Sequence, residues 1–143
     1  MKITIKNLIN VIKEEDQLIS KLYIYILKPI YWRFKLRRFG KGSVIHNEVI
    51  ILNPINVSIG NNFKIWHRSF LAVGTKGKIE IGNNGHLGVE VYLNAIEGKI
   101  IIGNNVAIAP KSQIYSYSNH YNSTESIINS YKVLMLLLRM KFG

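Results

Sequence analysis

One histidine of the chain, His120, lies in a polar stretch, YSYSNHYNS, at residues 115–123. Neutral imidazole, with an unperturbed pKa of about 6.5, can accept the proton of an attacking hydroxyl group. The sequence contains no cysteine, which excludes a thiol nucleophile and a thiolate metal site. His120 is therefore a candidate general base for a direct group transfer, and the alternative is a surface or packing histidine.

The other three histidines lack such a setting. His46 precedes the regular part of the chain, His67 follows Trp66, and His86 lies two positions after Asn84. Their spacing shows neither the HxH nor the HxxxH pattern that is typical of zinc sites. We expect all three to be outward-facing side chains, and no metal site is predicted.

A repeat organises the middle of the chain. The tetrapeptide IGNN occurs at residues 59–62, 81–84 and 102–105, at intervals of 22 and 21 residues. An aliphatic residue returns at every sixth position within these units, in Ile59, Ile65, Leu71, Ile81, Leu87, Leu93, Ile102, Ile108 and Ile114. Helices repeat near 3.6 residues and single strands near 2, so this period indicates short strands that turn a corner every six residues, as in a solenoid.

The intervals also indicate the size of each coil. Three sides of six residues make a coil of about 18, and the excess of three or four residues fits polar insertions at 75–78 and 97–99. Gly and Asn tolerate the left-handed backbone conformation that tight corners need. Ile45, Ile51 and Val57 keep the same spacing and predict an earlier, less regular coil.

These hexads resemble those of the hexapeptide-repeat acyltransferases, over residues 40–123. The resemblance implies a left-handed parallel β-helix, here of about three to four coils with a helical N-terminal segment. The branch that acetylates sugars has a histidine after such a coil, and His120 matches it. The implied reaction is acetyl transfer from acetyl-coenzyme A to a sugar hydroxyl, in surface polysaccharide or lipopolysaccharide biosynthesis.

The same resemblance indicates further site residues. Asn94, Tyr115 and Tyr117 are candidates for contact with the sugar substrate, although a corner amide and ordinary surface tyrosines are the alternatives. Ala109 and Pro110 occupy the segment where these enzymes let coenzyme A approach closely. Gly88 departs from the family, which often carries Asn near this position.

The N-terminal residues 1–41 are strongly basic, with ten Lys and Arg against three acidic residues. Residues 18–39 mix these cations with Leu, Ile, Tyr, Trp and Phe, but their longest apolar run, 22–27, is too short to span a bilayer. This composition favours peripheral contact with a membrane over binding to nucleic acid. A helical pair packed on the rest of the domain is the alternative. We expect a cytoplasmic protein, at the inner face of the membrane if this contact forms.

The C-terminal part lacks the repeat. After residue 127 there is no IGNN and no hexad, and the apolar run 133–138 is expected to be a short helical cap or a sign of truncation. The predicted division is a basic helical segment at 1–41, a β-helix at 42–118, and an active-site loop with an irregular or helical tail at 119–143. Related enzymes build their sites between subunits, which implies a homotrimer. The alternative function is a non-catalytic β-helix that binds a partner or assembles.

Overall fold

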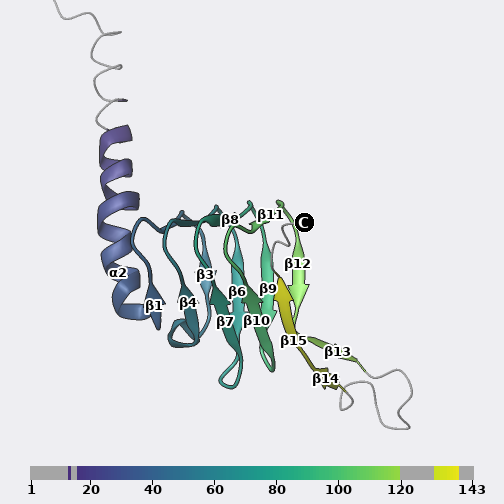
Figure 1. Cartoon of the computed structure of the whole chain (residues 1–143). Helices are drawn as coiled ribbons and strands as arrows, with labels where there is room; N and C mark the ends of the chain where they lie inside the picture. The colour runs from purple at the N-terminus through teal and green to yellow at the C-terminus, as the bar shows by residue number, and fades with distance from the viewer. Residues whose placement is uncertain (1–12, 14–15, 120–130, 139–143) are drawn as a thin grey trace, which may run out of the picture.

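The computed structural model describes residues 13, 16–119 and 131–138. Short strands wind into four successive coils, each of which contributes one strand to each of three parallel sheets (Figure 1). This arrangement confirms the predicted left-handed parallel β-helix with a helical N-terminal segment.

The strands of the solenoid are β1 (Arg38–Phe39), β2 (Val44–Ile45), β3 (Ile50–Ile51), β4 (Val57–Ile59), β5 (Phe63–Ile65), β6 (Phe70–Val73), β7 (Lys78–Ile81), β8 (Gly85–Leu87), β9 (Tyr92–Ala95), β10 (Lys99–Ile102), β11 (Ala107–Ile108), β12 (Gln113–Tyr115) and β15 (Met135–Leu138). The first sheet has the order β1-β4-β7-β10-β15, the second β2-β5-β8-β11 and the third β3-β6-β9-β12.

The core is a column of aliphatic side chains along the solenoid axis. Eight of the nine predicted inward residues are buried, and the ninth, Ile114, is partly buried on the fourth coil. The register stacks equivalent positions, so that Ile59, Ile81 and Ile102 are successive partners across β4, β7 and β10. Each coil therefore buries its apolar face against its neighbours, and the coils stabilise one another.

The Gly-Asn-Asn corners adopt the conformation that their composition predicts. The second asparagine of each corner is left-handed, with φ of 53° at Asn62, 55° at Asn84 and 59° at Asn105. Asn tolerates this region better than most other residues. The preceding glycine permits close stacking, since a Cβ added to Gly82 would lie 2.7 Å from the carbonyl carbon of Gly103.

The first asparagine of each corner joins neighbouring coils. The Asn61 backbone N–H donates to Asn83 Oδ1 at 2.7 Å, and the Asn83 N–H donates to Asn104 Oδ1 at 2.8 Å. The same contact begins the ladder, where the Lys41 N–H donates to Asn61 Oδ1 at 2.9 Å. These bonds satisfy backbone donors that the tight corner would otherwise leave unpaired.

The extra residues of each coil lie at one corner, between the third sheet and the first. The links 74–77 and 96–98 join β6 to β7 and β9 to β10, which agrees with the predicted insertions. In the first coil this corner contains the 3-10 helix η2 (Pro54–Asn56).

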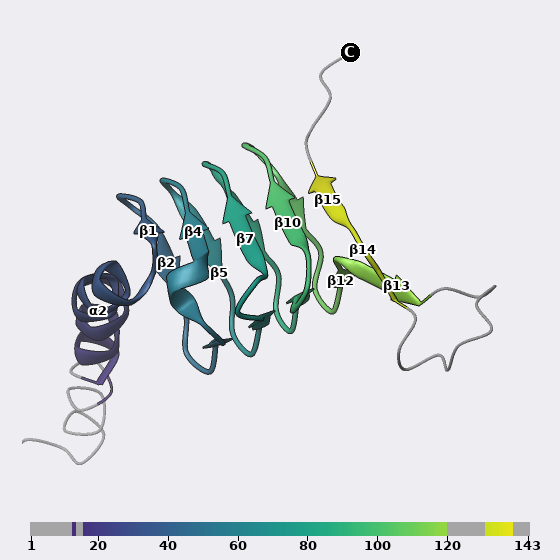
Figure 2. The same cartoon turned by 90° about the horizontal axis from the view of Figure 1, so that it is seen from below.

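The helical N-terminal segment packs against the first coil at one end of the solenoid (Figure 2). A π-helical turn, η1 (Tyr23–Leu27), leads into α2 (Lys28–Lys35). The Lys28 ammonium donates to the backbone carbonyl of His46 at 2.7 Å, and Trp32 packs on the core. The first coil begins at Arg38, inside the segment predicted to be helical, because β1 pairs with β4 from that residue.

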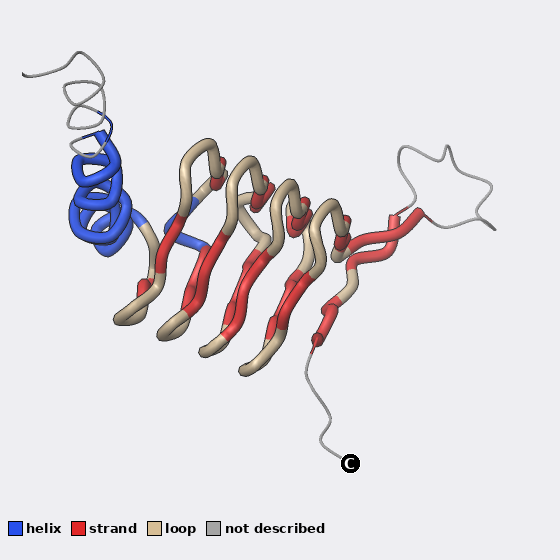
Figure 3. Tube along the Cα trace, turned by 90° about the horizontal axis from the view of Figure 1, so that it is seen from above, coloured by secondary structure: helices blue, strands red, loops and turns tan. Residues whose placement is uncertain are grey.

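The far end of the solenoid carries an arm. β13 (Tyr117–Asn119) and β14 (Tyr131–Val133) form an antiparallel pair that leaves the body of the solenoid (Figure 3). The chain then returns as β15, which pairs with β10 and continues the first sheet. The described part of the tail is thus made of strands, whereas the sequence was expected to form a helical or irregular tail. The reason is that Leu136 and Leu138 alternate as Ile100 and Ile102 do, and these residues are partners across the two strands.

Candidate functional site

Aromatic side chains line the outer face of the third sheet near the arm. Phe70 and Tyr92 stack with ring centroids 5.5 Å apart, and Tyr92 and Tyr115 follow at 5.6 Å. Tyr117, on β13, meets Tyr115 edge-on at 5.9 Å. The predicted substrate residues Tyr115 and Tyr117 therefore lie together at the exit edge, by which we mean the end of β12 and the start of the arm. Exposed aromatic faces of this kind can stack on a sugar ring.

Asn94 belongs to the same part of the sheet but is not open to solvent. It is the register partner of Tyr115, and its side chain is only 3% exposed. Its Nδ2 donates to Tyr92 Oη at 3.0 Å, and its Oδ1 accepts from the Ile96 N–H at 3.2 Å. Asn94 thus positions the aromatic face and the corner behind it. It would need to change partners before it could contact a substrate.

The exit edge also carries positive charge. A hollow of about 320 Å³ is lined by Lys76, Lys78 and Lys99, by Glu97, and by the link between β14 and β15. Lys99 is paired with Glu80 at 2.9 Å. Lys76 and Lys78 make this cationic hollow suitable for a phosphate group.

A second hollow, the Gly88 notch, lies at the opposite edge of the third sheet. It measures about 230 Å³ and is lined by Trp66, His86, Gly88, Val89 and Pro110. The absence of a side chain at Gly88 lets the next coil approach, since an added Cβ would lie 2.5 Å from the Pro110 nitrogen. An aromatic ring, an imidazole and a proline around a shallow depression can hold an apolar chain or a ring.

The predicted cofactor residues lie at this second edge. Ala109 and Pro110 are exposed at the corner that precedes β12, whereas Tyr115 ends that strand. The strand β12 (Gln113–Tyr115) lies between them, with Pro110 in the turn before it and Tyr115 as its last residue. One subunit therefore keeps the predicted cofactor residues apart from the predicted substrate residues.

His120 lies outside the described residues, one position after the end of β13. Its role as general base stays a prediction. Among the described residues, no group of three or more His, Asp or Glu side chains could hold a metal ion.

The sequence did not indicate the part played by Trp66 and His86. Both were treated as ordinary hexad positions, although the 21- and 22-residue registers place Trp66 beside Gly88 in the next coil and Gly88 beside Ala109 in the one after. That alignment of a large residue, a glycine and a small residue in successive coils is the signal that predicts a notch.

His46 is buried, contrary to the expectation of an outward-facing side chain. It is 7% exposed and stacks on Trp66 with ring centroids 4.4 Å apart, while the His67 ring is 4.8 Å away. Neither ring nitrogen has a hydrogen-bond partner. Burial lowers the pKa of His46, and the nearby His67, Lys28 and Lys64 lower it further.

This burial predicts that stability depends on pH. Because the pKa of His46 is lower in the folded state, the unfolded chain binds more protons below about pH 6.5. The free energy of unfolding should therefore be highest above that pH and should fall as the pH drops through it. His46→Phe keeps an aromatic ring against Trp66 and should reduce this loss, as measured by thermal unfolding at pH 7.5 and 5.5. Trp66→Phe, a control that removes no titrating group, should keep the dependence. Equal slopes in His46→Phe and the wild-type protein would contradict the assignment.

Known proteins resemble this chain in fold. No protein-family model and no curated protein matches the chain. Among solved structures, the chain is similar to that of AntD, an N-acyltransferase from Bacillus cereus, in complex with dTDP and 3-hydroxybutyryl-CoA. The TM-score is 0.66 and the sequence identity is 21%. The match covers 80% of this chain and 62% of the AntD chain. A variant of AntD in complex with dTDP-4-amino-4,6-dideoxyglucose and coenzyme A gives the same values.

The chain thus spans about 62% of the length of these solved structures. At 21% identity the similarity establishes the architecture. It agrees with the three parallel sheets and the inward aliphatic column. The chain is a left-handed parallel β-helix of about four coils with an N-terminal helix.

Proposed function

We propose that this chain transfers an acyl group from acyl-coenzyme A to a sugar. The observation that carries the proposal is the fold, which the chain shares with an N-acyltransferase solved with coenzyme A and a sugar nucleotide. The Gly88 notch offers an aromatic and apolar surface to a pantetheine chain, and the cationic hollow offers ammonium groups to phosphates.

In its finer form, the proposal is O-acetyl transfer from acetyl-coenzyme A, with His120 as the general base. His120 accepts the hydroxyl proton while the sugar oxygen attacks the thioester carbon. Backbone N–H groups at a coil edge stabilise the tetrahedral oxyanion. The carbon–sulfur bond then breaks, and the coenzyme A thiolate takes up the proton held by the imidazole. An amino sugar would follow the same steps with its nitrogen as the nucleophile.

The proposal includes a homotrimer. The predicted cofactor residues and substrate residues lie at opposite ends of β12, and in this proposal a neighbouring subunit brings its Ala109–Pro110 corner against an exit edge. A threefold arrangement of three-sided prisms does this at three equivalent grooves. The acceptor sugar belongs to surface polysaccharide or lipopolysaccharide assembly in this proposal.

A thiol-release assay tests the proposal. The full chain is incubated with acetyl-coenzyme A and with acceptors that offer either hydroxyls or an amino group, and free coenzyme A thiol is measured. Release should require an acceptor, and reaction with amino sugars alone would replace O-transfer by N-transfer.

Binding of coenzyme A gives an independent readout. Pro110→Glu places a carboxylate at the Gly88 notch and should weaken binding about tenfold or more in titration calorimetry, because the pantetheine chain would have to displace water from that charge. Ile55→Glu, a substitution of equal charge at an exposed position on η2, lies in neither hollow and is the matched control. A folded chain that neither binds coenzyme A nor releases thiol would support the alternative, a non-catalytic β-helix.

A further inference from the structure

The N-terminal helix presents an apolar stripe to solvent. The stripe consists of large apolar residues at every fourth position, all 48–85% exposed: Leu18, Leu22, Ile26, Ile30 and Phe34. In a regular α-helix each four-residue step overshoots one turn by about 40°, so such a series drifts around the helix. The π turn η1, with the Lys28 N–H bonded to the Tyr23 carbonyl, lengthens one turn and offsets part of that drift. The five side chains therefore stay on one face.

This face points away from the solenoid. Lys28 and Trp32 contact the first coil, through the carbonyl of His46 and the hydrophobic core respectively. Ile26, Ile30 and Phe34 are two residues from Lys28 or Trp32 and therefore lie on the opposite side of the helix. No described element covers them.

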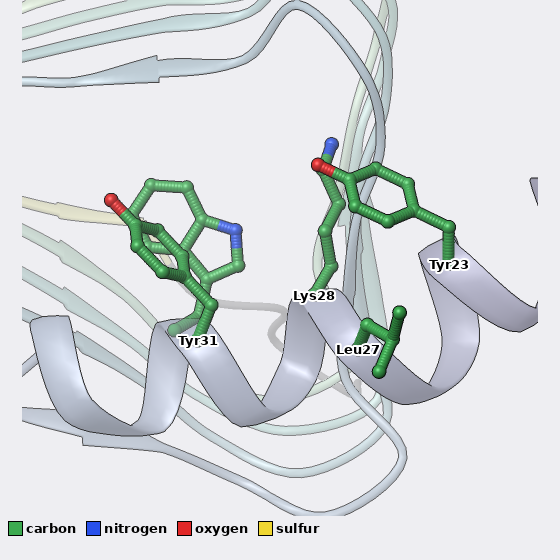
Figure 4. A pocket seen from close by; sticks show the side chains of 5 residues that line it. Tyr23, Leu27, Lys28 and Tyr31 are labelled. Atoms are coloured by element: carbon green, nitrogen blue, oxygen red, sulfur yellow. The ribbon is translucent and has the colours of Figure 1, made fainter.

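Cations and tyrosines flank the stripe. Residues 17–41 contain seven Lys and Arg and no acidic residue. Lys35 lies over the Tyr31 ring at 5.8 Å. On the side of the helix that faces the solenoid, Lys28 lies over the Tyr23 ring at 5.6 Å, beside a hollow of about 300 Å³ (Figure 4). Tyrosine rings and long basic side chains both suit the boundary between lipid tails and headgroups.

We propose that the outer face of this helix lies in the interfacial layer of an anionic phospholipid membrane. The stripe would enter the acyl boundary, and the flanking Lys21, Arg33 and Lys35 would contact the headgroup phosphates. No helix among the described residues is long and apolar enough to cross a bilayer. The helix therefore lies along the surface in this proposal.

Charge decides between a membrane and a second copy of the chain. Pairing two such helices through their stripes would bring together two segments that carry only positive charge over residues 17–41. Like charges facing each other oppose such an interface, whereas an anionic lipid surface neutralises them. The same cations make a neutral membrane a weaker partner.

Vesicle sedimentation of the full chain tests this proposal. Vesicles of phosphatidylcholine with a quarter phosphatidylglycerol should sediment the protein at least tenfold more strongly than pure phosphatidylcholine at physiological salt. The double variant Leu22→Glu with Ile26→Glu should lose at least tenfold of this binding while it keeps the wild-type circular dichroism. The matched control carries the same charge change on the solenoid, at the exposed positions Thr75→Glu and Ala107→Glu, and should bind nearly as well as wild type.

Three results would overturn the proposal. The first is equal binding to neutral and anionic vesicles, and the second is an equal loss in the stripe variant and its control. The third is a fall in molar mass on light scattering in the stripe variant alone, which would show that a second copy covers the stripe. The assay does not depend on acyl transfer, so its outcome is separate from that of the proposed function.

Discussion

His120→Ala should lower the rate of acyl transfer by a factor of about 10²–10⁴ while coenzyme A binding stays within about twofold of wild type. The reason is that a sugar hydroxyl attacks a thioester poorly until a base accepts its proton. Removal of the imidazole removes that acceptor and leaves the proposed notch and hollow unchanged. The comparison uses thiol release for the rate and titration calorimetry for binding.

The control for this prediction is His86→Gln, which alters the Gly88 notch and not the proposed base. It should change coenzyme A affinity more than the rate at saturating substrate. Equal rates in wild type and His120→Ala would show that His120 is not the base.

Oligomers that contain two different variants test whether each site is shared between two subunits. His120→Ala and Pro110→Glu each damage a different edge of the shared site. Trimers reassembled from equal amounts of the two variants should contain about a quarter of sites with both edges intact, and activity should return accordingly. No recovery in a trimeric mixture would place both residues in one subunit. A mass of 16.4 kDa that does not rise with concentration would contradict the trimer.

Gly82→Ala should destabilise the fold by about 3 kcal/mol, the upper end of the range for overpacking. The new Cβ would lie 2.6 Å from Asn104 Oδ1 and 2.7 Å from the carbonyl oxygen of Gly103. Backbone atoms of a central coil cannot move aside without lengthening the parallel bonds between β7 and β10. Urea unfolding followed by circular dichroism measures the change.

Ala107→Val provides the control for this substitution. Ala107 is exposed on β11, so the added methyl groups meet solvent, and β-branched residues suit strands. Its stability should stay within about 0.5 kcal/mol of wild type. Equal stability of Gly82→Ala and wild type would mean that the coils do not stack as closely as the structure shows.

The solenoid could be predicted from the sequence because each coil meets only its neighbours. A six-residue spacing locked to IGNN is a local signal that specifies both the inward side chains and the corners. Two of the departures from expectation, at His46 and at β15, lie in parts of the chain that lack the IGNN tetrapeptide. His46 lies in the irregular first coil, and its burial depends on Trp66 and Lys28, which come from a later coil and from the helix. The identity of residue 46 alone therefore does not predict that its side chain is buried.

The return of β15 to the solenoid escaped prediction for a related reason. Leu136 and Leu138 have the two-residue spacing of a strand, but their partners Ile100 and Ile102 are more than thirty residues earlier. The run 133–138 is apolar throughout, and periodicity alone does not separate a buried strand from a helix in such a run. For the candidate site, the sequence indicated Tyr115 and Tyr117, which lie together, but not that Asn94 is buried beneath them.

Because α2 packs on the first coil and the arm leaves the fourth, the solenoid acts as a spacer of fixed length between them. Neighbouring coils are about 4.8 Å apart and the helix is about 10 Å thick, so the exit edge would lie about 25 Å from the membrane surface proposed for the helix. A glycan linked to lipid at that surface would therefore present to the exit edge a sugar several units from its lipid anchor. The sugar next to the lipid would lie too close to the membrane to contact the exit edge. The number of hexad coils would then set which residue of a growing chain receives the acyl group, and deletion of one whole coil would move that choice about 4.8 Å closer to the lipid.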